Sequence, residues 1–111
     1  MNLNLKDIVA INQEFHNGKL ANEGSLAFAL SYARRTTNWV KALAIITRAI
    51  LIDHAFEDGN KRTAAAVIFT EAHMQGFTVN KNRLAHLIEA VLRKNVTSTR
   101  ELEEMIKDVI K

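Results

Sequence analysis

Proline is absent from the 111-residue chain, and only four glycines interrupt it. Proline ends or kinks a helix and glycine weakens one, so almost nothing in this chain prevents long helices. Apolar residues recur every three or four positions in six separate stretches, as they do along one face of a helix. The expected helices are Lys6–Phe15, Ser25–Arg35, Trp39–Asp53, Thr63–Met74, Asn80–Arg93 and Ser98–Ile110. We therefore predict an all-α fold, a single-domain bundle of about six helices over residues 1–111.

Local signals refine this prediction at a few positions. Ser25 is the expected N-cap of the second helix, and Ser98 or Thr99 that of the last, because their hydroxyl groups can accept a hydrogen bond from the first turn. The stretch Gly76–Val79 is expected to form one brief extended piece, and the helix Arg100–Lys111 a solvated cover. Aromatic residues expected in the core are Trp39, Phe69 and Phe77.

Composition narrows the function classes. Hydrophobic residues make up 48% of the chain and charged residues 24%, which is typical of a globular protein in water. The net charge of +3 is spread along the chain, so a solvated surface is favoured over a nucleic-acid-binding patch, and no direct nucleic-acid role is expected. Without a signal peptide, an 18-residue apolar stretch or any cysteine, the chain is expected to be cytoplasmic and to have no membrane partner.

The nine residues His54–Arg62 concentrate an imidazole, a carboxylate, an amide, two cations and a glycine directly before a predicted helix. A helix N-terminus exposes backbone N–H groups that have no partner in the helix, and it carries a partial positive charge. Such an end attracts phosphate without any side chain. Gly59 would allow the backbone to approach a phosphate closely. This loop is therefore a candidate phosphate site.

Each polar residue of the loop has a plausible task beside a phosphate. Asp58 could hold Mg²⁺ against phosphate oxygens, and Asn60 could donate a hydrogen bond to one of them. Lys61 and Arg62 could neutralise charge, and His54 could take a proton from an attacking hydroxyl, because imidazole exchanges protons near neutral pH. Together these residue types favour phosphoryl or nucleotidyl transfer.

The pattern His-x-Phe-x-Asp-Gly-Asn-x-Arg, from His54 to Arg62, resembles the signature of Fic and Doc (death-on-curing) proteins, H-x-F-x-[D/E]-G-N-x-R. The run from Asn22 to Leu30 also resembles a helix of that family, and the resemblance covers roughly residues 5–95. It implies a small helical fold with a short flap before the central helix, around Tyr32–Asn38.

The resemblance also implies a role for each residue of the loop. His54 would be the general base, Asp58 the metal-binding carboxylate, and Asn60 and Arg62 phosphate-orienting groups, while Phe56 would anchor the loop in the core. The implied activity is modification of a Ser, Thr or Tyr hydroxyl on a target protein, with Mg²⁺ as cofactor and ATP or another nucleoside triphosphate as co-substrate.

The loop departs from the commoner form of the signature, H-P-F-x-[D/E]-G-N-G-R-x-x-R, which is typical of members that transfer AMP. Ala55 replaces the proline, Lys61 the second glycine and Ala65 the second arginine. The Asn-Lys-Arg run resembles the Doc branch, which transfers the γ-phosphate of ATP to elongation factor Tu. Gly59, in contrast, is typical of the AMP-transferring members. Phosphotransfer is favoured, and AMP transfer stays open.

Further expectations concern partners and alternatives. The chain lacks the inhibitory motif [S/T]-x-x-x-E-[G/N] found in many members, so a separate antitoxin protein is expected, as in Doc systems. Glu57 and Lys61 are four residues apart and could form an ordinary ion pair. A non-catalytic module that binds an anion or a protein through the same fold is the remaining alternative. The histidines outside the loop are expected to be structural or exposed: His16, His73 and His86.

Overall fold

The computed structural model describes all 111 residues as six helices joined by short connections. Two isolated antiparallel bridges, and no β-strands, complete the backbone pairing. These findings confirm an all-α, single-domain bundle of six helices. No helix is both long and apolar enough to span a bilayer. The helices are α1 (Leu5–Gln13), α2 (Glu23–Ala33), α3 (Trp39–Leu51), α4 (Asn60–Met74), α5 (Lys81–Lys94) and α6 (Thr99–Val109).

Polar side chains start five of the six helices by accepting a hydrogen bond from a backbone N–H of the first turn. The N-cap of α2 is Asn22, whose side chain accepts from the amide of Ser25, so the prediction of Ser25 as the cap is wrong. Helix α4 is the exception, because its N-cap is Gly59, which has no side chain to offer. The five side-chain caps are Asn4, Asn22, Asn38, Asn80 and Ser98.

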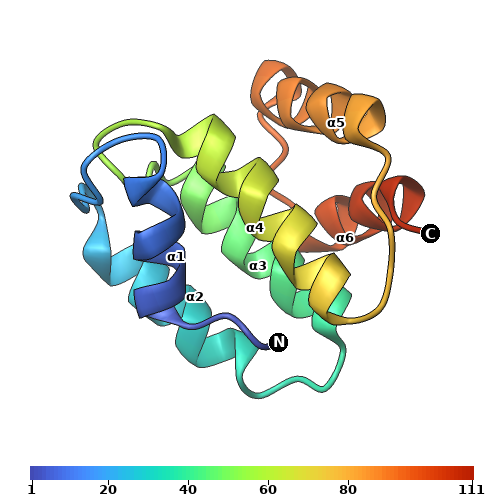
Figure 1. The fold of residues 1–111 in the computed structure, drawn as a ribbon, viewed down its shortest axis with the longest axis horizontal. Helices are drawn as coiled ribbons and strands as arrows, with labels where there is room; N and C mark the ends of the chain where they lie inside the picture. The colour runs from blue at the N-terminus through green and yellow to red at the C-terminus, as the bar shows by residue number, and fades with distance from the viewer.

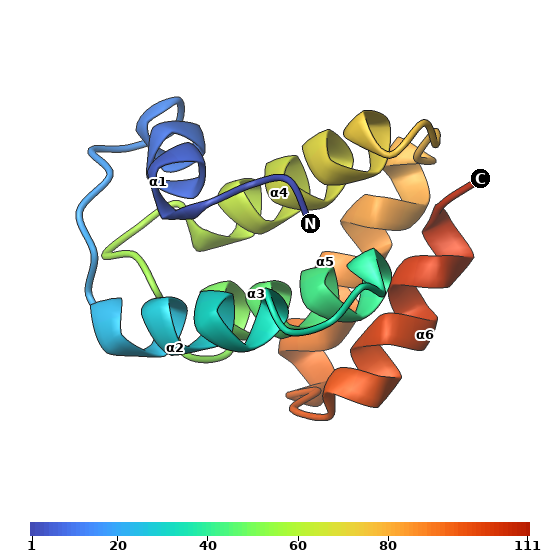
Figure 2. The ribbon, with the colours of Figure 1, turned by 90° about the horizontal axis from the view of Figure 1, so that it is seen from below.

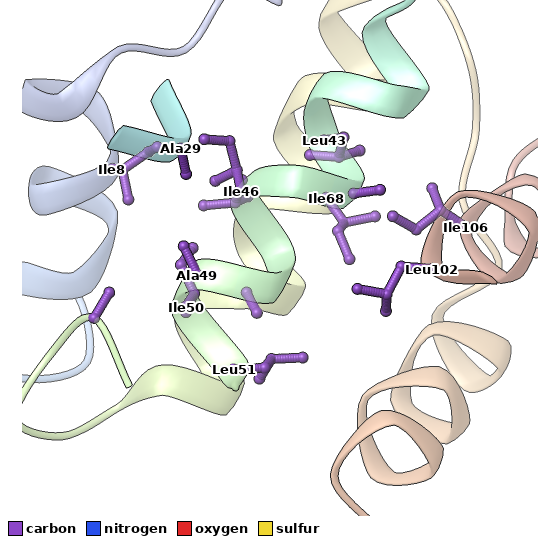
Figure 3. Packing of buried hydrophobic residues seen from close by; sticks show 14 of the residues in the cluster. Ile8, Ala29, Leu43, Ile46, Ala49, Ile50, Leu51, Ile68, Leu102 and Ile106 are labelled. Carbon is purple, nitrogen blue, oxygen red and sulfur yellow. The ribbon is translucent and has the colours of Figure 1, made fainter. Parts of the chain in front are cut away.

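Helix α3 is the centre of the bundle (Figure 1). It packs against α2 on one side and against α4 and α6 on others, which is why Leu43, Ile46 and Ile50 are fully buried. Figure 2 shows α1 and α4 in one layer over α2 and α3, with α5 and α6 at one end. Figure 3 shows how Ile68 and the α6 residues Leu102 and Ile106 complete this core.

Three predictions about the second half of the chain differ from the structure. Phe69 and Phe77 are 38% and 41% exposed and do not belong to the buried core, so the prediction for these two residues is wrong. Helix α6 is more than a solvated cover, since its apolar face packs on α3. The expected extended piece is reduced to one bridge between Val79 and Ile110.

Candidate functional site

The loop between α3 and α4 borders a cavity of about 610 Å³. This volume is within the range of pockets that bind small molecules and cofactors. Seven of its ten lining residues belong to the loop His54–Arg62, and the other three are apolar residues from α3, α5 and the segment after α1. The lining residues are Phe15, Leu51, His54, Glu57, Asp58, Gly59, Asn60, Lys61, Arg62 and Leu92.

Helix α4 begins at this cavity with backbone donors that the chain leaves unused. The first amide to bond within the helix is that of Thr63, which donates to the carbonyl of Gly59 at 2.9 Å. The amides of Asn60, Lys61 and Arg62 make no backbone or side-chain hydrogen bond, because Gly59 provides no capping side chain. Three unbonded N–H groups at the positive end of a helix dipole favour an anion there.

Gly59 is required by the local backbone itself. Its φ of +75° lies in the left-handed region, which glycine adopts without steric cost. A Cβ atom at this position would also lie 3.2 Å from Nδ2 of Asn12, closer than an ordinary van der Waals contact. Backbone conformation and the proximity of α1 therefore account for a glycine here without any bound ligand.

Asn60 ties the two sides of the loop together. Its Oδ1 accepts a hydrogen bond from the amide of Phe56 at 3.0 Å, and its Nδ2 donates to the carbonyl of Phe56 at 2.9 Å. The Phe56 side chain is 1% exposed and belongs to the hydrophobic core. Half of the hydrogen-bonding capacity of the Asn60 side chain is therefore used within the loop, and one N–H and one lone pair of Oδ1 remain for a ligand.

Asp58 is the only aspartate that lines the cavity. Its Oδ1 accepts a hydrogen bond from the amide of Gly59 at 2.7 Å, and its Oδ2 lies 4.0 Å from Nδ1 of His16. Three-quarters of the side chain is exposed, and no group of three or more His, Asp or Glu residues in the chain could hold a metal ion. Mg²⁺ is commonly held by one or two carboxylates together with substrate phosphates, so this single carboxylate fits a cation that arrives with a nucleotide.

The two cations of the loop differ in their partners. Nζ of Lys61 lies 3.3 Å from a carboxylate oxygen of Glu89 on α5, so Lys61 pairs with Glu89 and not with Glu57. Both partners are more than half exposed, and such a pair contributes less than about 1 kcal/mol. Arg62 is exposed and makes no hydrogen bond or ion pair with the rest of the chain.

His54 follows the end of α3 and has φ of +51°, an uncommon conformation for a residue with a side chain. Its side chain is exposed and makes no hydrogen bond within the chain. The preceding residue is fixed by α2: Ser25 Oγ donates to the Asp53 carboxylate at 2.5 Å, and Asn22 Nδ2 donates to the Asp53 carbonyl. With Phe56 anchored on its other side, His54 lies on a short, well-held turn.

The segment beside this loop differs from the expected flap. Helix α3 has 13 residues and is about 20 Å long, so the turn 34–38 lies at its far end from His54 (Figure 2). Residues 14–22 lie beside the loop instead, with Leu20 bridging Phe56 and the amide of Glu57 donating to the carbonyl of Lys19 at 3.0 Å. The expectation of a flap at Tyr32–Asn38 is therefore wrong in position.

No known protein family, curated protein or solved structure matches this chain. The resemblance to Fic and Doc proteins therefore depends on the sequence, chiefly on the loop motif His54–Arg62.

Several residues at the site could not be found from the sequence. Asn12 is fully buried and joins three segments: its Nδ2 donates to the Asp58 carbonyl at 3.0 Å and to Thr63 Oγ1 at 2.9 Å, and its Oδ1 accepts from the Gly18 amide at 2.8 Å. His16 and Glu89 also enter only through the fold. No spacing in the sequence links these residues to the loop, because they come from other helices and connections.

Proposed function

We propose that this chain is an enzyme of the Fic/Doc type, closer to the Doc branch, that transfers the γ-phosphoryl group of ATP to a hydroxyl group of a target protein. We further propose that it is the toxin of a toxin–antitoxin pair, with elongation factor Tu as the first candidate target. The observation that carries the proposal is that seven residues of the His54–Arg62 loop line one cavity at the uncapped N-terminus of α4. Phosphoryl transfer depends mainly on positioning and on stabilising negative charge, which such a site can provide.

In the proposed reaction, the oxygen of a Ser, Thr or Tyr hydroxyl attacks the γ-phosphorus. The bond from that phosphorus to the β,γ-bridging oxygen breaks, and ADP leaves. His54 accepts the hydroxyl proton, for which its exposed and unbonded ring is suited. The amides of α4 and the guanidinium of Arg62 stabilise the phosphate charge.

Two loop residues need a ligand-dependent change for this role. Lys61 must release Glu89 to reach a phosphate, and because their ion pair is exposed, a charge-assisted bond to phosphate can replace it at little cost. Asp58 would hold Mg²⁺ through its Oδ2, the oxygen that accepts no hydrogen bond from the backbone. When bound with the nucleotide, Mg²⁺ would neutralise charge on the phosphate oxygens.

Phosphotransfer rather than AMP transfer is proposed for two reasons. Lys61 puts a cation where AMP-transferring members of the family have glycine, and the second arginine of their signature is replaced by Ala65. Gly59 was the one feature in favour of AMP transfer, and its backbone conformation accounts for it independently.

Intact-mass spectrometry tests the proposal. The purified protein is incubated with ATP, Mg²⁺ and either elongation factor Tu or a bacterial lysate. A gain of about 80 Da on a target indicates phosphotransfer, and about 329 Da would indicate AMP transfer instead. His54→Ala should abolish the gain, whereas His86→Ala, at an exposed position on α5 outside the cavity, should leave it unchanged. If no protein gains mass in a His54-dependent manner, the enzymatic proposal fails.

Nucleotide binding separates the enzyme from a non-catalytic module of the same fold. Calorimetric titration with ATP should give binding that strengthens with Mg²⁺ in the wild type and loses this dependence in Asp58→Ala. Binding that is weak and indifferent both to Mg²⁺ and to Asp58→Ala would support the module. In cells, expression should slow growth, and His54→Ala should relieve the effect. Equal toxicity of the two forms would contradict a catalytic toxin.

A further inference from the structure

A second cavity of about 340 Å³ lies along α3, between α2 and the start of α6, and shares no lining residue with the loop cavity. Its apolar walls are Phe28 and Ala29 from α2 and Ile45 and Ala49 from α3. Phe28 is 73% exposed, although it is one of the largest apolar residues of the chain. The volume is near the lower limit for small-molecule pockets, which favours a small molecule as the occupant.

Arg48 is the unusual residue of this cavity. Its Nε atom is fully buried, yet no acceptor in the chain bonds to it, and none of its nitrogens lies within ion-pair distance of a carboxylate. Buried donors, and charged ones above all, almost always have a hydrogen-bond partner in folded proteins. The Arg48 side chain lines the cavity, and its two Nη groups also have no partner in the chain but are not buried, so they can donate to an acceptor oxygen of a bound molecule.

The other charged residues of the cavity also favour an anion. Lys41 lies seven residues before Arg48 on the same face of α3 and is exposed without an ion pair. The single carboxylate, that of Asp53, accepts a hydrogen bond from Ser25 Oγ at 2.5 Å. The cavity therefore holds two cations without an ion pair, Lys41 and Arg48, and one carboxylate that already accepts a hydrogen bond. The hydroxyl of Tyr32 adds another donor.

We propose that this cavity binds a small organic anion: one carboxylate or phosphate group on Arg48, with an apolar body against Phe28, Ala29 and Ala49. Arginine suits both anionic groups because its planar fork of N–H donors matches their oxygens. The exposed ring of Phe28 would cover the apolar part of the molecule. This site is independent of the phosphotransfer proposed for the loop.

The test is a titration of the isotope-labelled protein, followed by nuclear magnetic resonance, with benzoate and phenyl phosphate as the carboxylate and phosphate probes. Benzamide, which is neutral and similar in shape to benzoate, is the control ligand. At least one anionic probe should give saturable shifts of the Ala29 and Ala49 amides, and benzamide should bind at least about tenfold more weakly. Shifts confined to Gly59 and Asn60 would locate anion binding at the loop instead and would overturn the proposal.

Variants complete the test. Arg48→Gln should weaken binding of the better probe about tenfold, whereas Arg62→Gln, which removes a cation from the other cavity, should leave it unchanged. Phe28→Ala changes a mostly exposed side chain, so the variant should fold, and it should weaken binding about threefold or more. No saturable shift with either anion, or equal binding by wild type and Arg48→Gln, would refute the site.

Discussion

Asn12 provides the strictest test of how the candidate site is built. Its side chain is fully buried between α1, the segment after it, the loop and α4. Substitution by alanine removes one acceptor and two donor contacts, with bond lengths of 2.8, 2.9 and 3.0 Å. The substitution leaves the Gly18 amide, the Asp58 carbonyl and the Thr63 hydroxyl without these partners. The fold should remain, but the loop should lose its support from α1.

The expected cost follows from these three bonds. Each contributes a net of about 1 kcal/mol, and a buried group left without its partner costs about 1 to 3 kcal/mol. The better helix propensity of alanine offsets about 0.5 kcal/mol. We therefore expect Asn12→Ala to lower the free energy of unfolding by about 3 kcal/mol. For a domain of this size, that corresponds to a fall in Tm of roughly 15 °C.

Urea unfolding followed by circular dichroism measures this change. Asn82→Ala is the matched control, because Asn82 is exposed in the first turn of α5 and forms no hydrogen bond; its effect should be within about 0.5 kcal/mol. Thr63→Val combined with Asn12→Ala should cost less than the sum of the two single changes, because both remove the same hydrogen bond. A loss below about 1 kcal/mol for Asn12→Ala would refute this account of the site's support.

Three more predictions concern stability. Gly59→Ala should destabilise the fold by about 1 to 2 kcal/mol, because φ is +75° there, whereas Gly24→Ala, in an open helical position, should stabilise it by about 0.5 to 1 kcal/mol. Effects of the same sign on the denaturation midpoint would contradict this. Glu71→Ala should lower the free energy of unfolding by about 3 kcal/mol or more in the same urea experiment, because the buried carboxylate accepts hydrogen bonds from Asn2, Leu3 and Gln75. A loss similar to that of the exposed Glu89→Ala would show that these bonds contribute little. Hydrogen bonds from the Lys107 side chain, first to Glu103 and second to Glu104 in size of effect, raise the pKa of Lys107. The stabilising contribution of Lys107 is therefore complete below about pH 10.4, the ordinary lysine value, and is lost as pH rises through the raised pKa. Melting curves of wild type and Lys107→Met at alkaline pH should therefore converge, and a constant difference in Tm would contradict the shift.

The six helices could be predicted because their signals are local. Five helices carry their own polar cap, and a period of three to four apolar residues indicates the face that packs on α3. Helix α4 begins at Asn60, three residues before the predicted Thr63, because a glycine in the left-handed conformation replaces the usual side-chain cap. Phe69 and Phe77 were misjudged because nothing in a sequence indicates which apolar residues the other helices leave uncovered.

The candidate site also has a part that could be predicted from the sequence and a part that could not. Its main residues are consecutive, so their meeting at one cavity follows from a single short loop. Contacts across the fold were not predictable: Asn12 bonds Asp58 and Thr63, which are 46 and 51 residues away, and Lys61 pairs with Glu89 rather than with its neighbour Glu57. The hydrogen bonds of the Asn60 side chain were not predictable either, because only the backbone conformation of the loop brings its amide group to the N–H and the carbonyl of Phe56.

The backbone of His54 has a consequence for directed evolution. A left-handed conformation costs a residue with a side chain on the order of 1 kcal/mol, and glycine avoids this cost. A library selected only for thermal resistance should therefore enrich His54→Gly and discard the imidazole. A selection for the activity of the loop should do the reverse and retain histidine in spite of the strain. Position 54 is thus a place where heat tolerance and chemistry select opposite residues, and parallel selections from one library would show the divergence.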